Sequence, residues 1–416
     1  MTRRLVHAIA DQAMISAFNF GLNITLIKLW TPEDFGVFTI VSAVSLFAVM
    51  IQNAVINTPL AVHLPIALNE TEKALLRRTF STANLLLTLL VLVFSLGGLA
   101  LCLGLAQESL ILSASLYIVS QFVREYYRGL LAVEGQLVAL LLADTAYVAL
   151  ASAALIVLHE DDAVRWQSLS TFLLILSIAG MLSMFWHLLT EDRPALKDFP
   201  GEMDAVFRPQ IHEIRWSLLG AITTDILNRG YVYVAAVFFG PATVAQLQAG
   251  RIFFGPLGLL TVAWSRIARP QLARLSGLGD TLRFNALLRM ALCSFVLFNI
   301  LFLAILWAAW PYLSATLFGD KYQGLGFLVA GWGIANVVIQ VRSCLGVGAQ
   351  ALRQFRKLTL ATIYGALISA LIVMLACLLG QSAWLLVSVI GGESLAILLV
   401  ARILHCSVSR MDMQYS

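Results

Sequence analysis

The strongest constraint on this chain is the recurrence, along its whole length, of apolar stretches of about 20 residues, each long enough to cross the hydrocarbon core of a bilayer as a helix. Hydrophobic residues make up 60% of the sequence and charged residues 12%, a balance that excludes a water-soluble domain. A membrane barrel would instead show short strands of alternating polarity. We therefore expect an all-α polytopic membrane protein.

The apolar stretches predict twelve membrane spans. They cover residues 8–30, 36–60, 79–105, 108–132, 136–158, 165–189, 213–239, 242–268, 284–310, 325–349, 356–379 and 381–402. If the N-terminus lies in the cytoplasm, that side receives 21 of the 27 Lys and Arg residues, whereas the other side receives Lys28, Arg165 and Lys321. Because positive residues concentrate on the cytoplasmic side of membrane proteins, both termini are expected there.

The longest polar interruption predicts a cytoplasmic linker at 191–212 between two six-helix lobes, 1–190 and 213–416. The lobes have related turns, since Trp30-Thr-Pro-Glu33 can be superposed on Phe239-Gly-Pro-Ala242. We interpret them as repeats related by pseudo-two-fold symmetry, a plan that many secondary transporters share, with a substrate site between the halves.

The first span carries a polar stripe. At 100° per residue, Gln12, Ser16, Asn19 and Asn23 project within about 60° of one another on a helix. Lipid cannot satisfy these groups, so they either bond to neighbouring helices or line an aqueous cavity. Four polar residues on one narrow face favour the cavity. The matched turns place Asn228 opposite Asn19, which makes it a further candidate for substrate binding.

Arginines inside the second lobe are the main candidates for an anion site. Asp225 and Arg229 are spaced i, i+4 with the acid first, an orientation that favours an ion pair on one helix, either structural or functional. Arg251 is expected at a similar depth with no acid in its own span, so its partner must be another helix or a ligand. Arg342 is a third candidate, nearer the cytoplasmic end. Guanidinium groups suit diphosphate oxygens.

Other acids inside spans are candidates for ion coupling. Asp144 and Glu393 have no basic neighbour within one helical turn, so each is a candidate proton or cation site. Glu125 is expected to pair locally with Arg128. Asp11 projects about 100° away from the polar stripe, and we expect it to be solvated or paired with an arginine near the cytoplasmic end.

Several functions are disfavoured by missing motifs. The sequence has no Walker motif, no His-rich metal cluster and no nucleophile elbow. Its five cysteines show no CxxC spacing and are interpreted as packing residues. We therefore expect no enzymatic activity, cofactor, metal or nucleic-acid partner.

At this point two segments show a resemblance to a known family. Residues 11–41, with the step from Ser16 to Asn19 and the turn Pro32-Glu-x-Phe-Gly36, resemble the opening of bacterial O-antigen and exopolysaccharide flippases. These belong to the multidrug/oligosaccharidyl-lipid/polysaccharide exporter superfamily. Residues 246–275 look like the matching part of the second half. Their matching positions are Arg251, Gly255-Pro256 and Arg269-Pro270.

The resemblance implies a MATE-like fold in a bacterial inner membrane and transport of a polyprenyl-diphosphate-linked oligosaccharide from the cytoplasmic to the periplasmic leaflet. It also implies coupling to H⁺ or Na⁺, contact with membrane lipid, and polysaccharide polymerase or assembly proteins as partners. In this hypothesis Arg229, Arg251 and Arg342 hold the diphosphate, and Asp225 exchanges the cation. The alternatives are a multidrug or organic-cation antiporter of the same fold and, less favoured because the external loops are short, a membrane enzyme acting on the same lipids.

Overall fold

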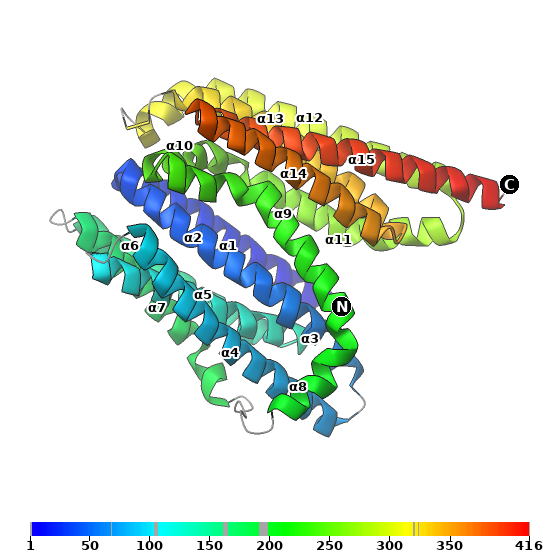
Figure 1. The fold of residues 1–416 in the computed structure, drawn as a ribbon, viewed down its shortest axis with the longest axis horizontal. Coiled ribbons are helices and arrows are strands. Elements are labelled where there is room, and N and C mark those ends of the chain that lie inside the picture. Colours follow the sequence, from blue (N-terminus) through cyan, green and yellow to red (C-terminus); the bar gives the residue numbers. More distant parts are fainter. Residues whose placement is uncertain are drawn as a thin grey trace. The chain divides into compact units, whose positions relative to one another are not determined.

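The computed structural model describes residues 2–67, 69–103, 107–160, 165–190, 199–318, 321–322 and 324–415. Within these ranges the regular structure is helical, as Figure 1 shows along the chain. The helices of the first half are α1 (Thr2–Leu29), α2 (Pro32–Gln52), α3 (Thr58–His63), α4 (Glu70–Leu103), α5 (Glu108–Val133), α6 (Leu137–Glu160), α7 (Arg165–Thr190) and α8 (Phe199–Phe207). Five π-helical residues, 53–57, join α2 to α3.

The second half continues the same pattern. Its helices are α9 (Ile211–Phe238), α10 (Pro241–Arg251), α11 (Gly255–Gly277), α12 (Thr281–Leu313), α13 (Leu325–Ala351), α14 (Phe355–Leu379) and α15 (Trp384–Tyr415). Each predicted span is matched by a helix or, for α2 with α3 and α10 with α11, by two consecutive helices. The all-α polytopic prediction is therefore confirmed.

Six helical segments in the described part of the chain are long and apolar enough to cross a membrane. They are Pro32–His63, Glu70–Leu101, Thr281–Phe318, Leu325–Ala351, Phe355–Leu379 and Trp384–Ser409. Helix α5 is not among them because Arg124, Glu125 and Arg128 interrupt its apolar surface. The chain is a multi-pass membrane protein.

The chain forms two compact units. The N-terminal unit comprises Met1–Leu22 and Val37–Ile222, and the C-terminal unit comprises Asn23–Gly36 and Thr223–Ser416. Helices α1, α2 and α9 therefore each contribute to both units. The predicted linker 191–212 lies within the N-terminal unit, where α8 and a short 3-10 turn follow residue 198. Residues 191–198 lie outside the described part.

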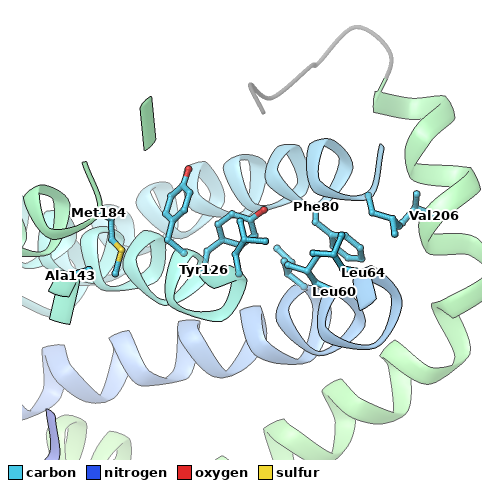
Figure 2. Close-up of a cluster of buried hydrophobic side chains, with 11 residues drawn as sticks. Leu60, Leu64, Phe80, Tyr126, Ala143, Met184 and Val206 are labelled. Carbon is cyan, nitrogen blue, oxygen red and sulfur yellow. The ribbon is translucent and has the colours of Figure 1, made fainter. Parts of the chain in front are cut away.

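A hydrophobic cluster holds α8 against the N-terminal unit (Figure 2). Leu60 of α3 and Leu64 of the 3-10 turn that follows it pack with Phe80 of α4 and Val206 of α8. Phe207 extends the contact, since its ring centroid lies 5.1 Å from that of Phe80. In a membrane such contacts stabilise mainly through van der Waals packing. The cluster fixes the segment that leads from α8 into α9.

Small residues allow close helix packing in the C-terminal unit. A Cβ atom added to Gly365 of α14 would lie 2.6 Å from the carbonyl oxygen of Gly392 of α15, and the reverse distance would be 2.7 Å. No real side chain tolerates such distances, so only glycine fits at this crossing. Gly391 and Gly392 are thus a packing notch, typical of helix contacts in membranes.

The tip of the hairpin between α1 and α2 belongs to the C-terminal unit. The ammonium of Lys321 donates hydrogen bonds to the carbonyl oxygens of Lys28, at 2.7 Å, and Trp30, at 3.3 Å. Gly36 contacts the backbone of Pro241 so closely that a side chain would overlap its carbonyl. These contacts hold both ends of the tip.

A turn is repeated between the two halves. After α5, Gly135 adopts a φ of 75°, and after α13, Arg353 adopts a φ of 57°. The amide that follows each of them donates to a carbonyl five residues earlier, Gln136 to Leu131 and Gln354 to Ala349. This register places Arg124 of α5 opposite Arg342 of α13, so the fourth span of each half carries an arginine at the same position.

Candidate functional site

The predicted ion pair on α9 is present. Arg229 Nη1 donates to Asp225 Oδ1 at 2.5 Å, and the hydroxyl of Tyr233 donates to Asp225 Oδ2 at 3.2 Å. The acid is buried, while about a third of the Arg229 side chain, 31%, is exposed. Because both oxygens of Asp225 already accept a hydrogen bond, a cation that binds there competes with Arg229 and Tyr233.

Arg251, at the end of α10, has a different environment. Its Nη1 donates to the hydroxyl of Tyr231 at 3.0 Å and to the backbone oxygen of Asn228 at 3.3 Å. Its guanidinium carbon lies 5.3 Å from the ring centroid of Trp332, within cation–π range. Across the described residues no carboxylate forms an ion pair with Arg251, and Glu393 acts on it only at longer range. The partners that α9 supplies are neutral.

The side chain of Asn228 is used within its own helix. Its Nδ2 donates to the carbonyl oxygen of Thr224 at 2.9 Å. The residue therefore contributes to the surroundings of Arg251 through its backbone oxygen. The predicted role of the Asn228 amide in substrate binding stays a prediction.

Arg342 and Glu393 form the third element of the C-terminal unit. Arg342 Nε donates to Glu393 Oε2, and the acid is completely buried. Glu393 indeed has no basic neighbour on its own helix, but α13 supplies one. Its second oxygen, Oε1, is buried without a hydrogen-bond partner in the described part of the chain. The predicted role of Glu393 in ion coupling stays a prediction.

A second charged cluster lies in the N-terminal unit. Asp144 Oδ1 accepts from Arg124 Nη2 at 2.5 Å, and Asp144 Oδ2 accepts from Arg128 Nε at 2.9 Å. Arg128 also bonds Glu125 at 2.8 Å and Asp11 at 3.3 Å. Asp144 thus has two arginine partners, which the search for a neighbour on its own helix missed. The predicted pair of Glu125 with Arg128 is confirmed.

Asp11 is more deeply placed than the sequence suggested. It is buried, faces Asp144 and pairs with Arg128, so of the two expected alternatives it takes the ion pair rather than solvation. The contacts join α1, α5 and α6, which are distant in sequence. The one local signal was the i, i+4 spacing of Arg124 and Arg128, which places both guanidinium groups on the same side of α5.

Two buried amide clusters also escaped the sequence analysis. In the N-terminal unit, Gln52 Nε2 donates to Asn84 Oδ1 at 2.7 Å and to the carbonyl oxygen of Phe122 at 2.8 Å. In the C-terminal unit, Asn299 Nδ2 donates to Gln340 Oε1 at 2.8 Å. The first cluster joins α2, α4 and α5, and the second joins α12 and α13, so both are hydrogen bonds between helices.

The polar stripe on α1 is not packed into the interior. Gln12 and Asn19 are exposed, while Ser16 and Asn23 are half-buried. Gln12 Nε2 lies 3.4 Å from Ser16 Oγ, a weak bond along the stripe itself. The predicted role of the stripe as the wall of an aqueous cavity stays a prediction.

The fold of the chain is similar to the folds of solved transporter structures. No family model and no curated protein sequence matches the chain. The solved structure of a lipid II flippase, MurJ, in an inward closed conformation is similar with a TM-score of 0.71 at 15% identity, covering 98% of this chain and 90% of that one. The chain has a MATE-like fold.

A second solved structure supports the same conclusion. It is a multidrug resistance MATE family transporter of the MOP superfamily in an inward-facing conformation, similar with a TM-score of 0.68 at 14% identity over 95% of this chain and 94% of that one. A MATE structure in a bent conformation gives 0.56 at 12% identity. Identities this low establish the fold and leave the substrate to be argued from the residues.

Proposed function

We propose that the chain is a flippase that moves a polyprenyl-diphosphate-linked oligosaccharide from the cytoplasmic to the periplasmic leaflet of a bacterial inner membrane by alternating access. The observation that carries the proposal is Arg251, a charged group inside the C-terminal unit whose bonded partners are neutral. The MATE-like fold supports it, because one similar structure is a lipid II flippase. The proposal involves no covalent chemistry on the substrate.

The charges of the C-terminal unit suit an anion. Asp225 neutralises Arg229 and Glu393 neutralises Arg342, so Arg251 leaves the membrane-spanning part of this unit with an excess positive charge. Within the described residues, Nη1 is the nitrogen of Arg251 that donates hydrogen bonds, so Nε and Nη2 remain for a ligand. A guanidinium with two such donors suits a diphosphate.

The remaining candidates take supporting roles in this proposal. Arg229, partly exposed, and Arg342 supply further donors when the diphosphate competes with their acids. The polar stripe of α1 contacts the sugars, and the polyprenyl tail stays in lipid. Asp225, or Glu393 or Asp144, exchanges H⁺ or Na⁺. Both termini lie in the cytoplasm, and polysaccharide polymerase or assembly proteins are the partners of the transporter.

The central test is reconstitution of Arg251→Ala in vesicles that contain a fluorescent polyprenyl-diphosphate sugar. Loss of a charge-assisted hydrogen bond of about 1.5–3 kcal/mol should slow leaflet transfer by roughly 10- to 100-fold. Arg251→Lys should recover part of the rate, because it restores the charge without the planar fork. Arg208→Ala, which removes an exposed positive charge, is the matched control. Transfer at the wild-type rate by Arg251→Ala would refute the proposal.

A multidrug or organic-cation antiporter is the second candidate. The N-terminal unit favours it, because its buried cluster contains three acids and two arginines, an excess of negative charge that suits a cation. Ethidium efflux from cells that express the protein separates the two functions. Efflux abolished by Asp11→Asn and unchanged by Arg251→Ala would favour the antiporter.

A further inference from the structure

The C-terminal unit exposes a strongly basic face at one end of its helices. A hydrophobic cluster that includes Leu272, Phe284, Val347 and Val408 holds the ends of α11, α12, α13 and α15 together there. The basic face consists of eight exposed side chains: Arg269, Arg274, Arg283, Arg289, Arg353, Arg356, Lys357 and Arg402.

The basic face is poorly neutralised. Arg283 pairs with Asp280 at 3.4 Å, and in the described part of the chain none of the other seven side chains forms an ion pair with an acid. Repulsion between so many like charges is unfavourable unless an anion lies among them. The face therefore has the charge of a surface that binds an anionic partner.

The corresponding end of the N-terminal unit shows that transmembrane topology alone does not require unpaired basic side chains. There Lys73 pairs with Glu70 at 2.6 Å and Arg77 pairs with Glu134 at 2.8 Å. Two further pairs join Arg78 to Glu202 and Arg208 to Asp204. Basic residues are expected on the cytoplasmic side of both units, yet in the N-terminal unit these four are each paired with an acid.

The two copies of the repeated turn also differ in charge. The N-terminal copy reads Glu134-Gly-Gln-Leu-Val-Ala139, whereas the C-terminal copy reads Leu352-Arg-Gln-Phe-Arg-Lys357. Arg353 takes the left-handed conformation that Gly135 takes in the first copy. A Cβ atom disfavours that conformation, and glycine, which has none, adopts it freely. The C-terminal unit therefore holds a positive charge where the backbone favours glycine.

Apolar side chains are exposed beside the basic face. Leu282 is 84% exposed, Leu278 is 65% exposed and Phe355 is 59% exposed. Each lies within a few residues of Arg283, Arg353 or Arg356. Alternating basic and large apolar side chains at helix ends are typical of segments that lie at the boundary between lipid headgroups and acyl chains.

We propose that the basic face binds the phosphates of anionic phospholipids, such as phosphatidylglycerol, while Leu278, Leu282 and Phe355 insert among the upper acyl carbons. Charge complementarity selects the anionic headgroup, since each basic residue near a membrane surface strengthens binding several-fold. The exposed apolar side chains favour lipid over an acidic protein segment, which would leave them in water. The site is separate from Arg251 and does not depend on the proposed transport function.

The test uses the full chain in detergent and native mass spectrometry with added phosphatidylglycerol or phosphatidylcholine. Arg356→Gln with Lys357→Gln removes two charges from the basic face, and Lys73→Gln with Arg208→Gln removes two paired charges from the N-terminal unit as the matched control. We expect phosphatidylglycerol binding to fall about 10-fold or more in the first double variant and less than twofold in the control. Binding should also weaken with added salt.

Arg353→Gly separates binding from folding. This variant removes a charge from the face and relieves the backbone, so it should bind phosphatidylglycerol more weakly while unfolding at the same or a higher temperature. Equal retention of phosphatidylglycerol and phosphatidylcholine by the wild type, or equal losses in the two double variants, would overturn the proposal. The face would then be assigned to an acidic protein segment.

Discussion

The membrane-embedded charges of the two units differ in net sign and in arrangement. In the N-terminal unit, Arg124 and Arg128 meet three acids, whereas the C-terminal unit holds the pairs Arg229–Asp225 and Arg342–Glu393 together with Arg251, which has no carboxylate partner among the described residues. Both clusters use the repeated arginine of the fourth span. The two halves therefore share the arginine of the fourth span but differ in the helix that supplies its acid, α6 in the N-terminal unit and α15 in the C-terminal unit, and in the charge around it.

The largest effect should follow from Asp144→Asn. This change leaves Arg124 buried without its carboxylate, and breaking a buried pair from one side costs about 3–5 kcal/mol. Thermal unfolding in detergent should show a large loss of stability. The control is Asp204→Asn, whose exposed pair with Arg208 should contribute about 0–1 kcal/mol. Similar losses in both variants would contradict the structural role of the N-terminal cluster.

Glu393→Gln should destabilise the C-terminal unit less. Arg342 loses its only carboxylate among the described residues, but its side chain is 13% exposed against 7% for Arg124, and one pair rather than two is broken. We expect a loss of about 2–4 kcal/mol in the same unfolding measurement. A loss greater than that of Asp144→Asn would reverse the ranking of the two clusters.

Asp225→Asn tests whether the C-terminal unit is built for anions. Removing this carboxylate frees Arg229 while leaving the length of the side chain unchanged. Affinity for a soluble diphosphate-sugar analogue, measured by isothermal titration calorimetry, should rise about three- to tenfold, because one competitor for the guanidinium is gone. Unchanged or weaker binding would indicate that the pair serves structure alone.

The smallest effects concern the repeated turn. Gly135→Arg should destabilise the N-terminal unit by about 1 kcal/mol, because it introduces the left-handed arginine found at position 353. Arg353→Gly should stabilise the C-terminal unit by a similar amount, readable as a shift of a few degrees in the unfolding midpoint. Shifts of the same sign in both variants would show that the two turns are not equivalent.

The sequence predicted the spans well and the charge partners poorly. Apolar length and basic loops define a helix without reference to its neighbours, so all twelve predicted spans have helical counterparts. The ion pair of Asp225 with Arg229 was found because it lies within one helix. Asp144 with Arg124 and Glu393 with Arg342 were missed because each joins two helices. Helical projection separated Asp11 from the polar stripe correctly, but it gave no measure of burial.

The hairpin tip held by Lys321 has a consequence for how the chain can be divided. Because residues 23–36 belong to the C-terminal unit, the polypeptide passes between the units in α1, in α2 and in α9. A fragment that ends at residue 190 would carry the hairpin without Lys321 and Pro241, which its tip contacts. A fragment that begins at residue 199 would contain those two residues but lack the tip. The two halves should therefore fold when they are co-expressed and fail to fold when they are expressed separately, because residues 23–36 of the first half complete the C-terminal unit.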